Sequence, residues 1–331
     1  MTSQYTNPGG VWFLAVNRQI LPVGSLYLSG MKKQIIFISL IGVACWMTSC
    51  QRSLMTVADM NKLASRAPDQ EYTYGPDSFQ YGALRLPKGN GPFPVVVLLH
   101  GGCWLAEYDM HLMDALASAL TLEGYATWNL EYRRLGNPGG GWPGTFQDVA
   151  GGIDFLRKLQ KNHPLDLDQV ILMGHSAGGH LALWAGSRAG LVGKTAVSRP
   201  DPLRPMAVIS LAGIVDLEDY LDRDGKSCGS QVDDLLGGLP EDVPERYRQT
   251  SPVRLPLTGV PRILVTGKRD PIVPRRHVKR YAKAHPQQEA QIQHVTIPGE
   301  GHFEVISPGT RSWEAIKQAL RAYRRESLRT S

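Results

Sequence analysis

The stretch "VILMGHSAGGHLALW" (residues 170–184) places a single serine, Ser176, between glycines where an apolar strand pattern gives way to an apolar helix pattern. The β-branched and long apolar residues before the turn predict a short buried strand, and the apolar residues after it predict one face of a helix. Glycine supplies the positive φ and the close backbone approach that so tight a reversal needs. The spacing Gly174-x-Ser176-x-Gly178 is typical of a nucleophile elbow, and the alternative is an ordinary turn whose serine caps the helix.

Strand and helix patterns alternate along the rest of the chain. Strands are expected in an N-terminal hairpin formed by "EYTYG" and "QYGALRLP", and then in "FPVVVLLHGG", "YATWNLEYR", "QVILMG", "PMAVISLAG", "PRILVTG" and "IQHVTIP". Helices are expected at 110–122, in "FQDVAGGIDFLRKLQ", after the central serine and at 312–324. Near-continuous apolar strands separated by helices predict an α/β fold with a mostly parallel central sheet and helices on both faces. The stretch 215–255 interrupts this rhythm, and we expect it to form a small cap or loop insertion over the C-terminal edge of the sheet, where such sheets bind ligands.

The stretch "MKKQIIFISLIGVACWMTSC" (31–50) has a composition of its own. Two lysines, a short apolar run and small residues are the parts of a secretory signal, and the run is shorter than the 18 or so residues of a membrane-spanning helix. Its final cysteine makes it resemble a bacterial lipoprotein signal, in which Cys50 would carry the lipid and Cys45 is a weaker competitor. An uncleaved membrane anchor and a buried first helix are the alternatives.

This interpretation divides the chain. Residues 1–30 would be an upstream extension or a misassigned start, residues 51–70 a polar linker, and residues 71–331 a single domain exported to the periplasm or cell exterior and lipid-anchored to a bacterial membrane surface. An oxidising compartment would allow a disulfide between Cys103 and Cys228, although sequence spacing leaves the distance between their α-carbons open. No CxxC or Cys/His spacing in the sequence indicates a zinc site.

The composition favours an ordinary globular domain. Hydrophobic residues make up 42% and charged residues 20% of the 331 residues, which allows a sizeable core. The net charge of +6 raises the question of nucleic acid, but the basic residues are scattered apart from "DPIVPRRHVKR" and "LRAYRRESLR". These two clusters are typical of solvated helix faces, so no nucleic-acid partner is expected.

Backbone donors are expected beside the serine. "LLHGGCW" ends a buried strand with Gly101 and Gly102, whose amide N–H groups can point into a site without side-chain obstruction. The N–H of Ala177, at the start of the helix, is the expected second donor. Such donors stabilise a developing oxyanion, and losing one typically costs about 3–4 kcal/mol of barrier. The alternative for the glycines is a loop without a function.

An acid and a base follow two later strands. Asp270, in "GKRDPIVP", can accept a hydrogen bond from a histidine and fix its tautomer, with a turn-capping role as the alternative and Asp216 as the rival acid. His302, in the glycine-flanked "IPGEGHFE", can take the serine proton and return it to a leaving group. Of the other histidines, His100 is expected to brace the glycine loop, His175 and His180 flank the elbow and are expected to point elsewhere, and the rest lack an evident partner. The chain order Ser, Asp, His is the one found in α/β-hydrolases.

The gathered residues resemble the α/β-hydrolase superfamily over roughly residues 80–325. More narrowly, "HGGCW", "EYRRLGNPGGGWPGTFQDV", "GHSAGGHLA", "LLGGLPEDVPERYRQTSPVRL" and "GKRDPIVP" resemble esterases related to kynurenine formamidase and bacterial feruloyl- and acetylxylan-esterase-like hydrolases. The resemblance implies Ser176 as nucleophile, Asp270 as acid and His302 as base, with Cys103 standing where formamidases often have tyrosine. "EYRRLGNP" departs from the corresponding string of the hormone-sensitive-lipase relatives, and kynurenine formamidases lack lipoprotein signals.

Together these features predict a serine hydrolase that cleaves carboxylic esters of a small molecule or a carbohydrate through a covalent acyl-enzyme, with no metal or organic cofactor. Cys103, Trp104 and Trp142 are candidates for the substrate pocket, with core packing as the alternative for each tryptophan. An arylformamidase, another small-amide hydrolase or a peptidase would use the same residues. A non-enzymatic binding protein on this scaffold would be favoured only if a position of the triad were lost.

Overall fold

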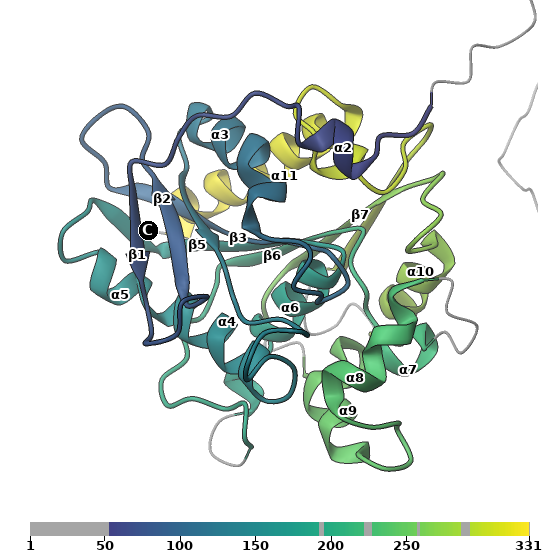
Figure 1. The fold of residues 1–331 in the computed structure, drawn as a ribbon. Coiled ribbons are helices and arrows are strands. Elements are labelled where there is room, and N and C mark those ends of the chain that lie inside the picture. Colours follow the sequence, from purple (N-terminus) through teal and green to yellow (C-terminus); the bar gives the residue numbers. More distant parts are fainter. Residues whose placement is uncertain (1–52, 192–194, 222–226, 257–258, 286–291, 331) are drawn as a thin grey trace, which may run out of the picture. The chain divides into compact units, whose positions relative to one another are not determined.

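A single eight-stranded sheet, ordered β1-β2-β4-β3-β5-β6-β7-β8, organises the structure (Figure 1). β1 and β2 pair antiparallel, as do β2 and β4, and every other pair is parallel. This confirms the predicted N-terminal hairpin and the mostly parallel sheet. The strands are β1 (Gln70–Thr73), β2 (Tyr81–Arg85), β3 (Phe93–Leu99), β4 (Ala126–Leu130), β5 (Leu165–His175), β6 (Ala207–Leu211), β7 (Arg262–Gly267) and β8 (Ile292–Ile297).

The computed structural model describes residues 53–191, 195–221, 227–256, 259–285 and 292–330. Ser53–Ser331 form one unit of the chain, and the predicted domain 71–331 lies within it. The predicted extension (1–30) and signal (31–50) fall outside the described residues and stay predictions. In the described part of the chain, no helix combines the length and the apolar character needed to cross a bilayer.

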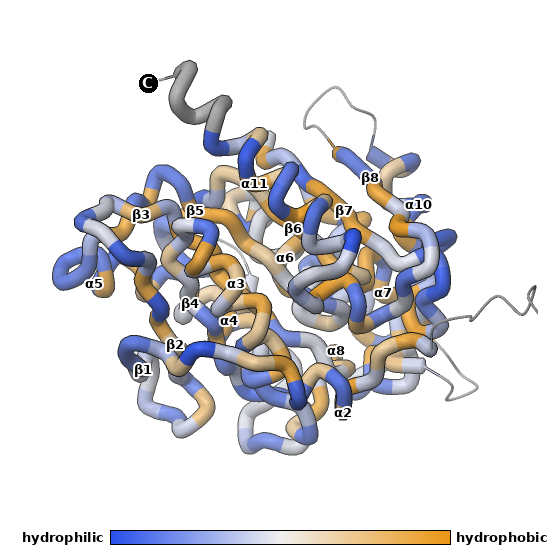
Figure 2. The backbone as a smooth tube through the Cα atoms, turned by 90° about the horizontal axis from the view of Figure 1, so that it is seen from above, coloured by the Kyte–Doolittle hydropathy of each residue, from blue (hydrophilic) through white to orange (hydrophobic). Residues whose placement is uncertain are grey.

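Helices cover both faces of the sheet because its buried strands are apolar on both sides. Along β3, Val95, Val97 and Leu99 belong to one hydrophobic cluster and the residues between them to a second. α4 and α6 pack in the first cluster and α3 and α11 in the second, on opposite faces (Figure 1). Figure 2 shows the hydrophobic residues of β5 within this sheet. The longer helices are α3 (Asp114–Leu122), α4 (Gly144–Asp154), α6 (Ala177–Ala185), α10 (Arg275–Ala284) and α11 (Arg311–Thr330), and shorter ones are α5 (Leu156–Leu159), η2 (Met110–Met113) and η3 (Arg188–Leu191).

The insertion predicted at 215–255 consists of short helices packed together beside α6 and α10 (Figure 1). Apolar side chains from each of its α-helices, including Leu217, Val232, Leu235 and Tyr247, are buried in the first hydrophobic cluster. The insertion is therefore part of the folded body and contributes to its core. Its helices are α7 (Leu217–Tyr220), η4 (Cys228–Gln231), α8 (Val232–Leu236), α9 (Pro244–Thr250) and η5 (Pro252–Arg254).

Residues 51–70, predicted as a polar linker, contain a packed element. Thr56 and Asp59 form a capping box that begins α2 (Val57–Met60), and Met60 is buried in the second cluster. The stretch is polar overall, but a few of its residues are apolar and pack against the second hydrophobic cluster. The segment therefore contributes to packing as well as connecting to the domain.

Candidate active site

Ser176 lies in a strained turn between β5 and α6. Its φ of 54° and ψ of −118° are unusual for a residue with a side chain, and its hydroxyl makes no capping hydrogen bond to α6. The flanking glycines are required by space: a β-carbon on Gly174 would lie 2.0 Å from the carbonyl oxygen of Gly178, and one on Gly178 would lie 2.1 Å from that of Leu99. The turn therefore has the form of the predicted elbow and not of a helix cap.

A histidine and a carboxylate meet at the ends of two later strands. His302 Nδ1 donates to Asp270 Oδ2 over 2.7 Å, and both residues are buried. Asp270 Oδ1 accepts the N–H groups of Ile272 (2.8 Å) and Val273 (2.9 Å), which fix the carboxylate in the loop after β7. This contact keeps the proton of a neutral imidazole on Nδ1, so Nε2 is free to accept a proton.

The rival acid Asp216 has another role. Its carboxylate caps α7 by accepting the N–H groups of Glu218 (3.2 Å) and Asp219 (3.3 Å). Its surroundings include His277, whose Nε2 accepts the N–H of Val215. Burial raises the pKa of Asp216. The structure therefore brings Asp270, and not Asp216, to His302.

Ser176 and His302 line the same cavity of about 80 Å³. Its wall is mainly apolar and comes from several distant parts of the chain: Val57, Gly102, Cys103, Tyr108, Leu112, His175, Cys228, Ile272 and Phe303. Apart from Cys103 and its possible disulfide partner Cys228, the apolar and aromatic wall residues were not singled out from the sequence. They carry no chemical motif, and only the fold brings them together.

The expected oxyanion loop passes directly beside the serine. A β-carbon on Gly101 would lie 3.1 Å from the β-carbon of Ser176, and one on Gly102, whose φ is +108°, would lie 2.3 Å from that of Tyr108. Ala177 is buried at the first position of α6. Glycine at position 101 thus lets the backbone approach the serine more closely than a side chain would permit, and glycine at position 102 allows a positive φ next to Tyr108.

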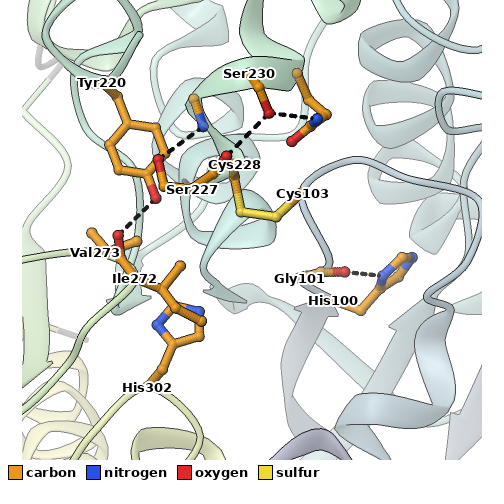
Figure 3. The surroundings of a disulfide bond; sticks show 12 residues. His100, Gly101, Cys103, Tyr220, Ser227, Cys228, Ser230, Ile272, Val273 and His302 are labelled. Atoms are coloured by element: carbon orange, nitrogen blue, oxygen red, sulfur yellow. Dashed lines mark hydrogen bonds between the residues drawn. A yellow bond between two sulfur atoms is a disulfide. The ribbon is translucent and has the colours of Figure 1, made fainter. Parts of the chain in front are cut away.

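A disulfide connects this loop to the insertion (Figure 3). It joins Cys103 and Cys228, whose α-carbons are 5.0 Å apart and which are separated by 125 positions in the sequence. Both cysteines line the cavity. The pairing that the sequence left open is therefore present, and it connects a wall of the cavity to the residues that follow β3.

The two tryptophans differ from the expected pocket walls. Trp104 is fully buried, with its ring 5.4 Å from that of His180 in an edge-to-face arrangement. Trp142 packs 6.0 Å from the ring of Phe146 and lies beneath the guanidinium of Arg246. Neither is among the residues that line the cavity with Ser176. Trp104 is thus a core residue, and Trp142 is partly buried against the core.

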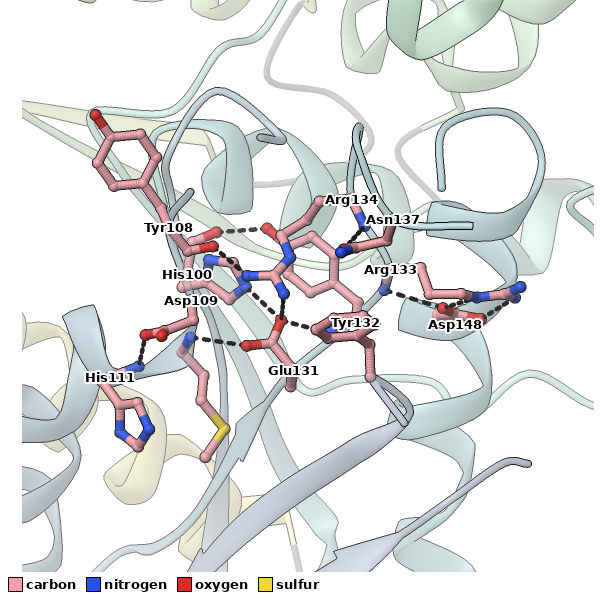
Figure 4. Close-up of polar contacts among 12 residues, drawn as sticks. His100, Tyr108, Asp109, His111, Glu131, Tyr132, Arg133, Arg134, Asn137 and Asp148 are labelled. Atoms are coloured by element: carbon pink, nitrogen blue, oxygen red, sulfur yellow. Dashed lines mark hydrogen bonds and ion pairs between the residues drawn. The ribbon is translucent and has the colours of Figure 1, made fainter. Parts of the chain in front are cut away.

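Buried polar contacts hold the expected oxyanion loop in place around His100 (Figure 4). His100 contacts the carbonyl of Gly101 through Nδ1 and Glu131 through Nε2, at 2.8 and 3.1 Å. Glu131 also accepts the N–H groups of Tyr132 and Met110. Burial opposes ionisation of Glu131, but His100 and nearby groups together hold its pKa below the usual value. This matches the expected bracing role of His100, while Glu131 was not predicted.

His175 supports the other side of the site. Its Nε2–H donates to the backbone carbonyl of His302 over 2.9 Å, and the two rings are 4.6 Å apart. Burial, reinforced by the neighbouring His302, lowers the pKa of His175 well below its usual value, so its ring is neutral. It thus holds the backbone of His302 without adding charge. Within the described residues, no group of three His, Cys, Asp or Glu side chains is placed to hold a metal ion.

Several known proteins are similar to this chain in sequence. Esterase LipC of Mycobacterium tuberculosis is 26% identical over 227 residues, covering 67% of this chain and 55% of that protein. Dipeptidyl aminopeptidase BIII of Pseudoxanthomonas mexicana is 25% identical over 248 residues, which cover 71% of this chain and 34% of that protein. The chain thus spans about half or less of the length of these curated relatives.

Solved structures share the fold at low sequence identity. Esterase B from Lactobacillus rhamnosis superposes with a TM-score of 0.66 at 21% identity, covering 91% of this chain and 98% of the other. A truncated carbohydrate esterase from gut microbiota gives a TM-score of 0.65 at 19% identity, and the match covers 79% of this chain and 98% of the other. The predicted α/β-hydrolase architecture is confirmed by these matches. The family model BD-FAE matches residues 84–284, more than half of the sequence, and the chain therefore belongs to the BD-FAE family.

Proposed function

We propose that this protein hydrolyses carboxylic esters through Ser176, His302 and Asp270. The observation that carries the proposal is the 2.7 Å contact between the His302 imidazole and the Asp270 carboxylate at the cavity that Ser176 also lines. A nucleophile in a strained elbow, a base with a fixed tautomer and an orienting carboxylate are the parts of a serine hydrolase triad.

In the proposed mechanism, the Ser176 hydroxyl attacks the ester carbonyl while His302 Nε2 takes its proton. The N–H groups of Gly101, Gly102 and Ala177 are the candidate donors to the oxyanion of the tetrahedral intermediate. The imidazolium then protonates the leaving alkoxide, which leaves an acyl group on the serine. Water, deprotonated by the same imidazole, attacks this acyl-enzyme and releases the carboxylic acid. The chemistry requires no metal or organic cofactor.

The cavity favours a small acyl group. Its volume of about 80 Å³ is roughly half of the about 150 Å³ that accommodates a benzene ring in a protein core. Its apolar wall suits a short aliphatic chain. We therefore propose acetyl or similarly short acyl groups, attached to a small alcohol or to a carbohydrate, as the first substrates to test. One structural neighbour is named a carbohydrate esterase, which supports a carbohydrate as the alcohol part of the ester.

Amide hydrolysis is the second candidate. The same three residues would serve an arylformamidase or a peptidase, and one relative is a dipeptidyl aminopeptidase of which this chain spans 34%. Hydrolysis rates on p-nitrophenyl acetate, methyl ferulate, acetylated xylan and N-formylkynurenine would separate these classes. Preference for N-formylkynurenine over all the esters would replace the ester proposal with the formamidase.

Fluorophosphonate labelling tests the enzyme itself. We expect the wild-type protein to be labelled once, at Ser176, and Ser176→Ala to resist the probe. Equal labelling of both proteins, or none of the wild type, would remove the catalytic assignment and favour a binding protein on the same scaffold.

We further propose that the protein is exported and attached to a membrane by a lipid on Cys50. The signal-like composition of residues 31–50 supports this, and the disulfide is compatible with an oxidising compartment. Cys50→Ser should abolish incorporation of labelled fatty acid and release the protein from membranes. Unchanged membrane association would contradict the anchor.

A further inference from the structure

The segment 54–60 reaches the active-site cavity from the start of the described chain. Val57, at the start of α2, lines the same cavity as Ser176 and His302. The methyl groups of Leu54 lie against Gly301, where an added β-carbon would come within 3.0 Å of them. The segment therefore contacts both the cavity and the residue that precedes the histidine.

A buried carboxylate joins this segment to the histidine loop. Glu304, in η6 (Glu304–Ile306), accepts the N–H of Met55 at Oε1 over 2.7 Å and the N–H of Gly301 at Oε2 over 3.0 Å. The side chain is only 8% exposed, so these contacts are shielded from water. One carboxylate thus spans 249 sequence positions and holds two backbones next to His302.

Glu304 thus forms a junction between residues 54–60 and the His302 loop, and neither segment lies in the region that matches the family model, residues 84–284. We propose that residues 54–60 form a wall of the acyl pocket, that Val57 sets the size of the group bound there, and that Glu304 is a positioning residue that holds this wall and the His302 loop together. The inference rests on the proposed esterase function, because it assigns a specificity role within that site.

Size selectivity tests the wall. Val57→Ala enlarges the cavity and Val57→Leu reduces it, so the ratio of kcat/KM for p-nitrophenyl butyrate to that for the acetate should rise in the first variant and fall in the second. A change of about tenfold in each direction is the expected scale for one or two carbon atoms in an apolar pocket. Ala58→Leu is the matched control, because Ala58 is exposed on the same helix. If the kcat/KM ratio is unchanged in both Val57 variants, or changes equally in the Ala58→Leu control, residues 54–60 do not form a wall of the acyl pocket.

Hydrogen exchange tests the junction without relying on turnover. In Glu304→Gln the amide oxygen can accept only one of the two N–H groups, and the new NH₂ faces the other donor. We expect amide exchange to accelerate at least tenfold both in residues 54–60 and in residues 300–303. kcat should fall about tenfold with a smaller change in KM, because a displaced base slows chemistry more than binding.

Glu300→Gln is the control for this substitution. Glu300 is equally buried in the same loop, but its carboxylate accepts N–H groups of Arg311 and Ser312 at the start of α11. Its loss should lower stability while residues 54–60 stay protected. Faster exchange of 54–60 in both variants, or in neither, would overturn the positioning role. Absence of Ser176 labelling in the wild type would instead remove the proposed function, and the pocket assignment with it, while exchange would still decide whether Glu304 joins the two segments.

Discussion

Removal of the Cys103–Cys228 disulfide should lower the stability of the protein and the activity of its site together. The bond closes a loop of 125 positions. The chain-entropy relation for a loop of this length gives about 5 kcal/mol of stabilisation at 25 °C, and measured losses for native disulfides are typically about 2–5 kcal/mol. We therefore expect Cys103→Ala/Cys228→Ala to lose about 2–5 kcal/mol of the free energy of unfolding.

The single variants sharpen this prediction. Either substitution alone already breaks the bond, so each single variant should lose nearly as much stability as the double variant, and the two losses should not add. Urea unfolding of all four proteins at one pH measures this directly. Adding a reductant should move the urea midpoint of the wild type towards that of the double variant, and leave the double variant unchanged.

Ester hydrolysis provides the second measurement. Cys103 follows the expected oxyanion donors Gly101 and Gly102, and its own φ of 55° shows that the chain there is held in an unfavourable conformation. We expect kcat to fall about tenfold in the folded double variant, less than the 10²–10³ lost when one oxyanion donor is removed. Additive losses in the single variants, a wild-type midpoint insensitive to reductant, or unlinked Cys103 and Cys228 peptides by mass spectrometry would refute the reasoning.

Three further predictions concern the triad, the elbow and the buried His180. Asp270→Asn should reduce kcat by about 10⁴ through loss of the correct His302 tautomer, measured as ester hydrolysis by a protein with unchanged circular dichroism; a loss below tenfold would argue against the triad. Gly178→Ala should destabilise the fold by more than about 2 kcal/mol in urea, because its β-carbon would meet the Leu99 carbonyl at 2.1 Å, and a neutral result would contradict that contact. Burial lowers the pKa of His180 from 6.5 to about 4. The neutral His180 therefore contributes about 3 kcal/mol to the free energy of unfolding above pH 6.5, and this contribution is lost as the pH falls towards 4. In His180→Gln the free energy of unfolding should depend less on pH between 6.5 and 4, and an unchanged slope would contradict the prediction.

The sequence predicts the chemical residues of the site because these follow the ends of regular strands. β3, β7 and the second half of β5 are mostly apolar and buried, whereas β8 mixes apolar and polar residues, and each of the four strands is followed by one part of the proposed machinery. Parallel neighbours end at the same edge of a sheet, so the order of patterns along the chain already places these parts together. The elbow was also predictable, since only glycine fits where β5 and α6 approach this closely.

The pocket wall was not predictable, because its members share no motif and come from unrelated elements. Val57 and Cys228 are 171 positions apart (228 − 57), yet both line the cavity. Their positions depend on how α2 and the insertion pack onto the body, which composition does not encode. Trp104 shows the converse: it was a pocket candidate from the sequence, but its ring is fully buried and packs edge-to-face against His180.

The triad residues and the pocket-wall residues are held in place in different ways, and this affects how substitutions can change the site. Ser176, Asp270 and His302 are held by backbone geometry at strand ends, where even a single added carbon at Gly178 meets a carbonyl oxygen. The wall is held by individual contacts, the disulfide at Cys103 and the hydrogen bond from Met55 to Glu304, while the second hydrogen bond of Glu304, from Gly301, supports the His302 loop. Substitutions in the wall can therefore alter the acyl group accepted while the triad geometry is retained, whereas substitutions in the elbow remove turnover of every substrate at once. Selectivity ratios that change in Val57 variants, at a constant rate of fluorophosphonate labelling, are the signature of that separation.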